Sequence, residues 1–85
     1  MKTVTYVIKD ELGIHARPAG LLVKEVGKYN SIVTLSNGTK EADAKKIMAL
    51  MALGVKKGQS VTFKIEGADE AEAAAGIEAF MKANL

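Results

Sequence analysis

Residues 13–19 read Gly-Ile-His-Ala-Arg-Pro-Ala and separate an alternating segment from a segment with helical spacing. Before them, residues 2–9 place apolar side chains at every second position, which is typical of a half-buried strand. Pro18 fits the first turn of a helix, because its missing N–H would have no partner there. The stretch therefore predicts a strand, a short loop, and a helix that begins at Ala16 or Arg17. Apolar residues then follow the spacing of one helix face: Ala19, Leu22, Val23 and Val26.

The rest of the chain continues to alternate between strand and helix patterns. Strands are predicted over 31–36, 40–43 and 61–66, and helices over 47–53 and from Asp69 onward. Asn37-Gly38 predicts a tight hairpin turn between the second and third strands. Asp69 and Glu72 have the spacing of a capping box at the start of the last helix. The predicted order is βαββαβα, in a single domain of residues 1–85.

Four strands with one apolar face need a cover, which the amphipathic helices supply. Right-handed crossovers place the fourth strand beside the first and the hairpin pair beyond it. We therefore expect an α+β fold, an open-faced two-layer β-sandwich. Its four-stranded antiparallel sheet should have the order 1-4-2-3 and be covered on one face by helices.

The composition excludes several classes of site. The chain has no cysteine and one histidine, so it offers neither a disulfide framework nor a zinc site. No apolar run approaches the ~18 residues that span a bilayer, and the N-terminus alternates rather than forming a signal-peptide core. The net charge of +2 is too small to imply nucleic acid. We expect a cytoplasmic protein with no metal, no cofactor, no nucleic-acid partner and no membrane insertion.

His15 lies just before the first predicted helix, at an end without a side-chain cap. No Ser, Thr, Asp or Asn stands at positions 14–17, so the backbone N–H groups of Ala16 and Arg17 face outward. A helix N-terminus of this kind favours anions such as phosphate. The Arg17 guanidinium can hold two phosphate oxygens at once. These neighbours indicate a phosphoryl site at His15, although a lone histidine is more often a solvated loop residue.

The predicted helix over 47–53 contains no polar side chain and cannot bury every face in a two-layer domain. If Leu50 and Leu53 point inward, an apolar patch is exposed, made of Ile47, Met48 and Met51. Such a patch often marks a contact site, and methionine can pack against several different partners. The alternative is that both methionines fill gaps in the core. Three residues of the first helix extend this docking surface or are ordinary solvated residues: Gly20, Lys24 and Gly27.

The heptapeptide over 13–19 closely resembles the active-site sequence of HPr, the family of histidine-containing phosphocarriers of the sugar phosphotransferase system. The resemblance covers the whole chain and includes Tyr29, Asn37-Gly38, residues 47–54, Lys57-Gly58 and Gly67. It implies that His15 accepts a phosphoryl group on Nδ1 from enzyme I, which phosphoenolpyruvate charges, and donates it to enzyme IIA domains. It also implies a carrier rather than a stand-alone enzyme. A monomer with transient complexes suits that role.

One position departs from the family pattern. Many HPr-family members have a regulatory serine just before the short helix, where this chain has Lys46. The departure leaves open a specialised paralogue in a nitrogen-related or dihydroxyacetone-kinase phosphorelay, without serine control.

Two alternatives of other classes remain. A small RNA-binding domain would need exposed aromatic residues on the sheet, whereas Tyr6 and Phe63 share the set expected to face the helices. A regulatory binding module without phosphoryl transfer would have no use for His15.

Overall fold

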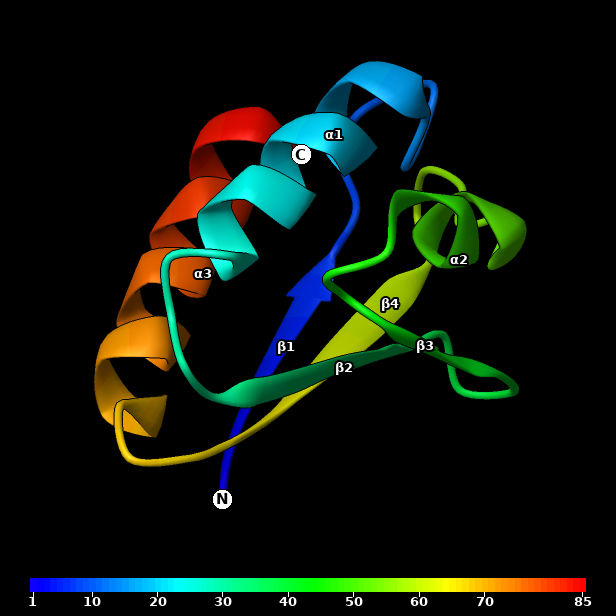
Figure 1. The fold of residues 1–85 in the computed structure, drawn as a ribbon. Helices are drawn as coiled ribbons and strands as arrows, with labels where there is room; N and C mark the ends of the chain where they lie inside the picture. The colour runs from blue at the N-terminus through cyan, green and yellow to red at the C-terminus, as the bar shows by residue number, and fades with distance from the viewer.

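The computed structural model describes residues 1–85 and contains the predicted order of elements (Figure 1). The elements are β1 (Lys2–Val7), α1 (Ala16–Val26), β2 (Ile32–Ser36), β3 (Glu41–Asp43), α2 (Ile47–Ala52), β4 (Ser60–Glu66) and α3 (Glu70–Asn84). The strands form one antiparallel sheet of order β1-β4-β2-β3, which confirms the predicted topology. The helices cover one face of this sheet, with α1 beside α3 and α2 near the start of α1 (Figure 1). None of the helices has the length and apolar character needed to cross a membrane.

The core lies between the sheet and the helices. β4 is central in the sheet, and its Val61, Phe63 and Ile65 are fully buried, as the alternation predicts. They join a cluster of 20 buried apolar residues drawn from every element. All the aromatic side chains lie in this cluster or pack against it: Tyr6, Tyr29, Phe63 and Phe80. The open face of the sheet therefore lacks the aromatic stacking platform that an RNA-binding domain requires.

The hairpin between β2 and β3 has a longer turn than the sequence predicts. The Asn37 side-chain Oδ1 accepts hydrogen bonds from the backbone N–H groups of Thr39 (2.9 Å) and Lys40 (2.8 Å). The first cross-strand pair after the turn is Ser36 with Glu41, so residues 37–40 all belong to the turn. The third strand accordingly begins one residue later than predicted. The Asn37 N–H bonds to the Lys40 carbonyl oxygen at 3.1 Å, but the Lys40 N–H bonds to the Asn37 side chain instead of the Asn37 backbone oxygen, so the pair is incomplete.

The prediction of a capping box at the start of α3 is wrong. The Asp69 carboxylate makes no hydrogen bond to its own helix and instead accepts bonds from the Ser31 hydroxyl and the Asn30 N–H, the latter at 2.8 Å. These two donors, the Ser31 hydroxyl first, hold the pKa of Asp69 below its ordinary value. Asp69 therefore joins the start of α3 to the loop between α1 and β2.

Candidate functional site

The loop between β1 and α1 is held against two distant parts of the chain. Gly13 has a φ of +67°, and a Cβ atom there would lie 2.2 Å from the Val55 carbonyl oxygen. Only glycine fits both restrictions. The next residue, Ile14, is buried and donates its N–H to the same Val55 oxygen at 3.1 Å. At the start of the loop, the N–H groups of Lys9 and Asp10 donate to the Leu85 backbone oxygen at 2.6 and 2.9 Å. His15 is thus carried on a fixed loop.

His15 is the N-cap residue of α1, and its side chain is 36% exposed. Its backbone is extended, and its carbonyl oxygen accepts the first helical bond from Ala19 N–H at 2.9 Å. The helix begins at Ala16, as predicted, with no side-chain cap and no acidic residue in its first turn. The first backbone donors of α1 and the positive end of its dipole are therefore free to attract an anion beside the imidazole.

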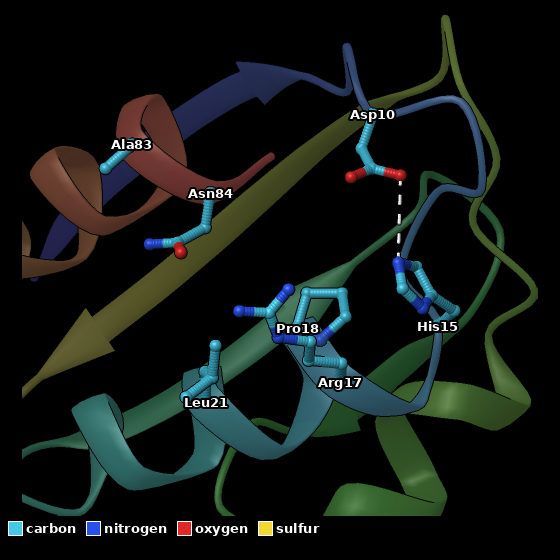
Figure 2. A pocket seen from close by; sticks show the side chains of 7 residues that line it. All are labelled: Asp10, His15, Arg17, Pro18, Leu21, Ala83 and Asn84. Carbon is cyan, nitrogen blue, oxygen red and sulfur yellow. Dashed lines mark ion pairs between the residues drawn. The ribbon is translucent and has the colours of Figure 1, made fainter.

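An acidic residue that the sequence analysis did not single out faces the imidazole. The Asp10 Oδ1 lies 3.7 Å from the His15 Nε2, and the two side chains point toward each other across the loop (Figure 2). The same oxygen accepts the Leu12 N–H at 2.9 Å, a bond typical of an Asx turn. The sequence signal for this turn is an aspartate three residues before Gly13, but nothing in the spacing indicates that it points at His15.

A pocket of about 230 Å³ opens between the start of α1 and the end of α3. The Arg17 guanidinium extends into it toward Asn84, away from the His15 ring (Figure 2). Arg17 is exposed and forms no hydrogen bond or ion pair with another residue, so all of its donors are available to a bound anion. The pocket lining also includes residues that sequence reasoning missed: Asp10, Leu21, Ala83 and Asn84. No local pattern places residues 83–84 near His15, because the tertiary packing of α1 and α3 brings them together.

The short helix α2 exposes the apolar residues that the sequence predicts. Leu50 and Leu53 are buried, whereas Met48 is 74% exposed. Ile47 and Met51 are also exposed, so the alternative in which both methionines fill the core is wrong. We call Ile47, Met48 and Met51 the α2 patch.

The α1 residues predicted to extend this patch differ in their surroundings. Gly20 lies where α1 approaches α2, and a Cβ atom there would be 3.6 Å from Ile47 Cδ1, an ordinary contact distance. Lys24 and Gly27 are exposed farther along α1. Gly20 therefore borders the α2 patch directly, and the other two continue away from it along the helix.

Electrostatically, the site combines one histidine, one carboxylate and one free guanidinium around a helix N-terminus. No three His, Cys, Asp or Glu side chains converge anywhere in the structure as a metal site would require. The Asp10–His15 contact becomes an ion pair only when the imidazole is protonated. The arrangement suits nucleophilic attack by a ring nitrogen on an anionic group held at the helix end.

Comparison with known proteins agrees with this chemistry. A family model described as the PTS HPr component phosphorylation site matches residues 2–83. The phosphocarrier protein HPr of Mycoplasma genitalium is 44% identical over 85 residues, which cover 99% of this chain and 97% of that protein.

Solved structures of HPr proteins are also similar to this chain. The crystal structure of HPr-C-His from Thermoanaerobacter tengcongensis aligns with a TM-score of 0.92 and 40% identity, covering 98% of this chain and 93% of that one. A histidine-containing phosphocarrier protein described from Mycoplasma aligns with a TM-score of 0.91 and 35% identity, covering 94% and 91% of the two chains. This chain belongs to the HPr family, the phosphocarrier components of the phosphotransferase system.

Proposed function

We propose that this protein accepts a phosphoryl group on His15 from phospho-enzyme I and donates it to enzyme IIA domains during phosphoenolpyruvate-dependent sugar uptake. The observation that carries the proposal is the exposed imidazole directly before a helix end that has neither a cap nor an acidic residue. A phosphoryl group added to this ring would meet the free N–H groups of Ala16 and Arg17 and the positive end of the α1 dipole.

The transfer step needs no nucleophile and no general acid or base from this chain other than His15. A ring nitrogen of His15 attacks the phosphorus of the donor, so that one P–N bond forms while the donor's P–N bond breaks. Phosphoryl transfer depends mainly on positioning and on electrostatic stabilisation of the phosphoryl oxygens. The unpaired Arg17 guanidinium supplies that stabilisation by turning from Asn84 to the phosphoryl oxygens. The protein then acts as a carrier between enzymes rather than as a stand-alone enzyme.

The α2 patch would form the centre of the docking surface for both partners. Ile47, Met48 and Met51 lie on a helix that contacts α1, so a partner that covers them also reaches His15. Gly20, Lys24 and Gly27 would extend the contact along α1. The proposal includes a cytoplasmic monomer that binds donor and acceptor in turn, since the same exposed surface must be released between the two encounters.

Lys46 favours a second candidate function that uses the same phosphoryl chemistry at His15. Its exposed ammonium stands directly before α2 and offers no hydroxyl for a serine kinase. A specialised relay, nitrogen-related or coupled to a dihydroxyacetone kinase, would use the same His15 chemistry without serine control. Acceptor domains from each kind of relay distinguish these candidates by their rates of discharge.

The test follows the phosphoryl group through both transfers. The protein is incubated with phosphoenolpyruvate and enzyme I, and its intact mass is measured before and after a IIA domain is added. We expect one acid-labile phosphoryl group that the IIA domain removes. A protein that gains a phosphate but passes it to no acceptor would contradict the carrier role, and one that gains none would instead be a binding module.

A further inference from the structure

We propose that Asp10 is a positioning residue that keeps the imidazole proton of His15 on Nε2 and so presents Nδ1 for phosphoryl transfer. The inference rests on the proposed function and deepens it, because it assigns a role to a side chain outside the heptapeptide at residues 13–19. It also accounts for an acidic group placed beside a site that otherwise attracts anions.

The geometry favours a proton on the nitrogen that faces the carboxylate. A carboxylate oxygen only accepts hydrogen bonds, so a lone pair on the His15 Nε2 would repel the Asp10 Oδ1 at their separation of 3.7 Å. An N–H at the same position is attracted instead, and the bond that one ring nitrogen makes decides which nitrogen carries the proton. The separation is longer than a hydrogen bond, and contacts of this kind often shorten when the reaction partner binds.

Asp10 is fixed from several directions, so its carboxylate is aimed before any partner arrives. Its N–H donates to the Leu85 oxygen at 2.9 Å, and its own carbonyl oxygen accepts the Gly13 N–H at 3.0 Å. Its Oδ1 accepts the Leu12 N–H at 2.9 Å. A side chain held in this way loses little conformational freedom when it binds the ring.

The charge balance of the reaction explains why a carboxylate is useful here. The neutral ring carries its proton on Nε2, and Nδ1 uses its lone pair to form the new P–N bond while the donor's P–N bond breaks. The product is a phosphoimidazolium whose positive charge lies between the α1 dipole, which repels it, and Asp10, which attracts it. When the acceptor takes the phosphoryl group, the electron pair returns to Nδ1, and no proton enters or leaves at either step.

Asp10→Asn and Glu11→Gln form a matched pair of variants. Each removes one negative charge, but Glu11 is exposed and faces Lys57 at 3.9 Å rather than the ring. Asparagine at position 10 retains the side-chain oxygen that accepts the Leu12 N–H and faces Nε2, so the loop keeps its turn and only the negative charge beside the ring is lost. We expect Asp10→Asn to slow transfer from phospho-enzyme I by about tenfold, the effect of losing one charge-assisted contact, and Glu11→Gln to transfer at the wild-type rate.

A spectroscopic readout tests the tautomer without any partner protein. With 15N-labelled histidine, the two ring-nitrogen shifts of unphosphorylated His15 report the share of each tautomer when the ring is neutral. We expect almost pure Nε2–H in the wild type and in Glu11→Gln, and a larger share of Nδ1–H in Asp10→Ala. Ring shifts unchanged in Asp10→Ala would overturn the assignment of the tautomer to Asp10, and wild-type transfer in Asp10→Asn would overturn the role of its negative charge. If the wild type itself takes no phosphate, the proposed function fails, and the ring shifts alone then decide whether Asp10 sets the tautomer.

Discussion

Helices α1 and α3 begin in opposite ways. α1 begins with a half-exposed histidine and a free arginine, with no acid in its first turn. α3 begins with Asp69, followed by Glu70 and Glu72 in its first turn, and the Glu70 carboxylate pairs with the N-terminal amine at 3.0 Å. Neither helix has a side-chain cap, but the acids of α3 complement its dipole and Asp69 accepts hydrogen bonds from the 30–31 loop, whereas the first turn of α1 has no acid.

Under the proposed function, the difference between the two helix starts follows from the need of α1 to accept a phosphoryl group. An acid at the start of α1 would help the helix and repel an incoming phosphoryl group. At α3, where the proposed function requires no bound anion, acids complement the dipole, and Asp69 joins the start of the helix to the 30–31 loop. Exchanging these features between the two helix starts should therefore separate phosphoryl transfer from stability.

The largest effect should come from giving α1 an acid like those of α3. Ala16 is exposed in the first turn of α1, so Ala16→Glu should fold normally. Two unit charges about 6 Å apart repel by about 3 kcal/mol at a near-surface dielectric of about 20, which corresponds to roughly a hundredfold slower transfer. Thermal melts should show equal or higher stability. Ala16→Gln is the uncharged control, and equal transfer rates in the two variants would contradict the account of the helix end.

Removing the free cation at the start of α1 should have the next largest effect. Arg17→Ala loses hydrogen bonds to a charged phosphoryl group, which corresponds to about 2 kcal/mol in transfer. Its melting temperature should stay near that of the wild type, because Arg17 has no partner within the folded chain. Arg17→Lys should restore only part of the rate, since lysine cannot grip two oxygens in a fixed geometry. Wild-type transfer kinetics in Arg17→Ala would show that the guanidinium is not used.

The α2 patch can be compared with an equally exposed apolar residue far from the site. Met48→Asp should weaken binding to both enzyme I and a IIA domain by about 2 kcal/mol, because it buries an unpaired charge in each complex. Ile32, which is 71% exposed on the sheet, provides the control Ile32→Asp. Titration calorimetry should detect weaker binding only in the first variant. Equal losses in both would place the docking surface elsewhere.

The smallest effect on transfer, and a clear effect on stability, should follow from changing the start of α3. The folded-state pKa of Asp69 lies below its ordinary value of 3.8, so its stabilising contribution is present above that pH and disappears as the pH falls through the lowered pKa. Asp69→Asn should therefore have a lower melting temperature than the wild type at neutral pH, and the two melting temperatures should converge in acid well below pH 3.8. Glu72→Gln, which changes an exposed acid of the same turn, is the control. A difference in melting temperature between Asp69→Asn and the wild type that stays constant across the pH range would contradict a stabilising role for the ionised Asp69 carboxylate.

Most of the fold could be predicted because periodicity and turn chemistry point to the same elements. The alternation of apolar and polar side chains in β4 predicted which of its faces is buried, and Pro18 predicted the start of α1 to within one residue. The prediction of a capping box was wrong because the Asp69 carboxylate can bind either the N–H groups of its own helix or donors elsewhere in the fold. Only the three-dimensional packing shows that it binds the donors of the 30–31 loop. Local patterns cannot distinguish a near partner from a distant one.

Only part of the candidate site could be predicted, because local sequence patterns do not report tertiary contacts. His15 and Arg17 lie in one heptapeptide, so sequence alone brings them together. Asn84 reaches the pocket only through the packing of α3 on α1, and Asp10 faces the ring only because the loop turns back at Gly13. These two contacts depend on tertiary structure and leave no periodic signal.

The most direct test of the central claim is to locate the phosphate after incubation with phosphoenolpyruvate and enzyme I. Peptide mapping by mass spectrometry under conditions that preserve acid-labile bonds should place a single phosphoryl group on His15 in the wild type. His15→Ala should acquire none while its circular dichroism and melting temperature remain those of the wild type. A phosphate retained by His15→Ala, or mapped to any other residue of the unmutated chain, would contradict the account.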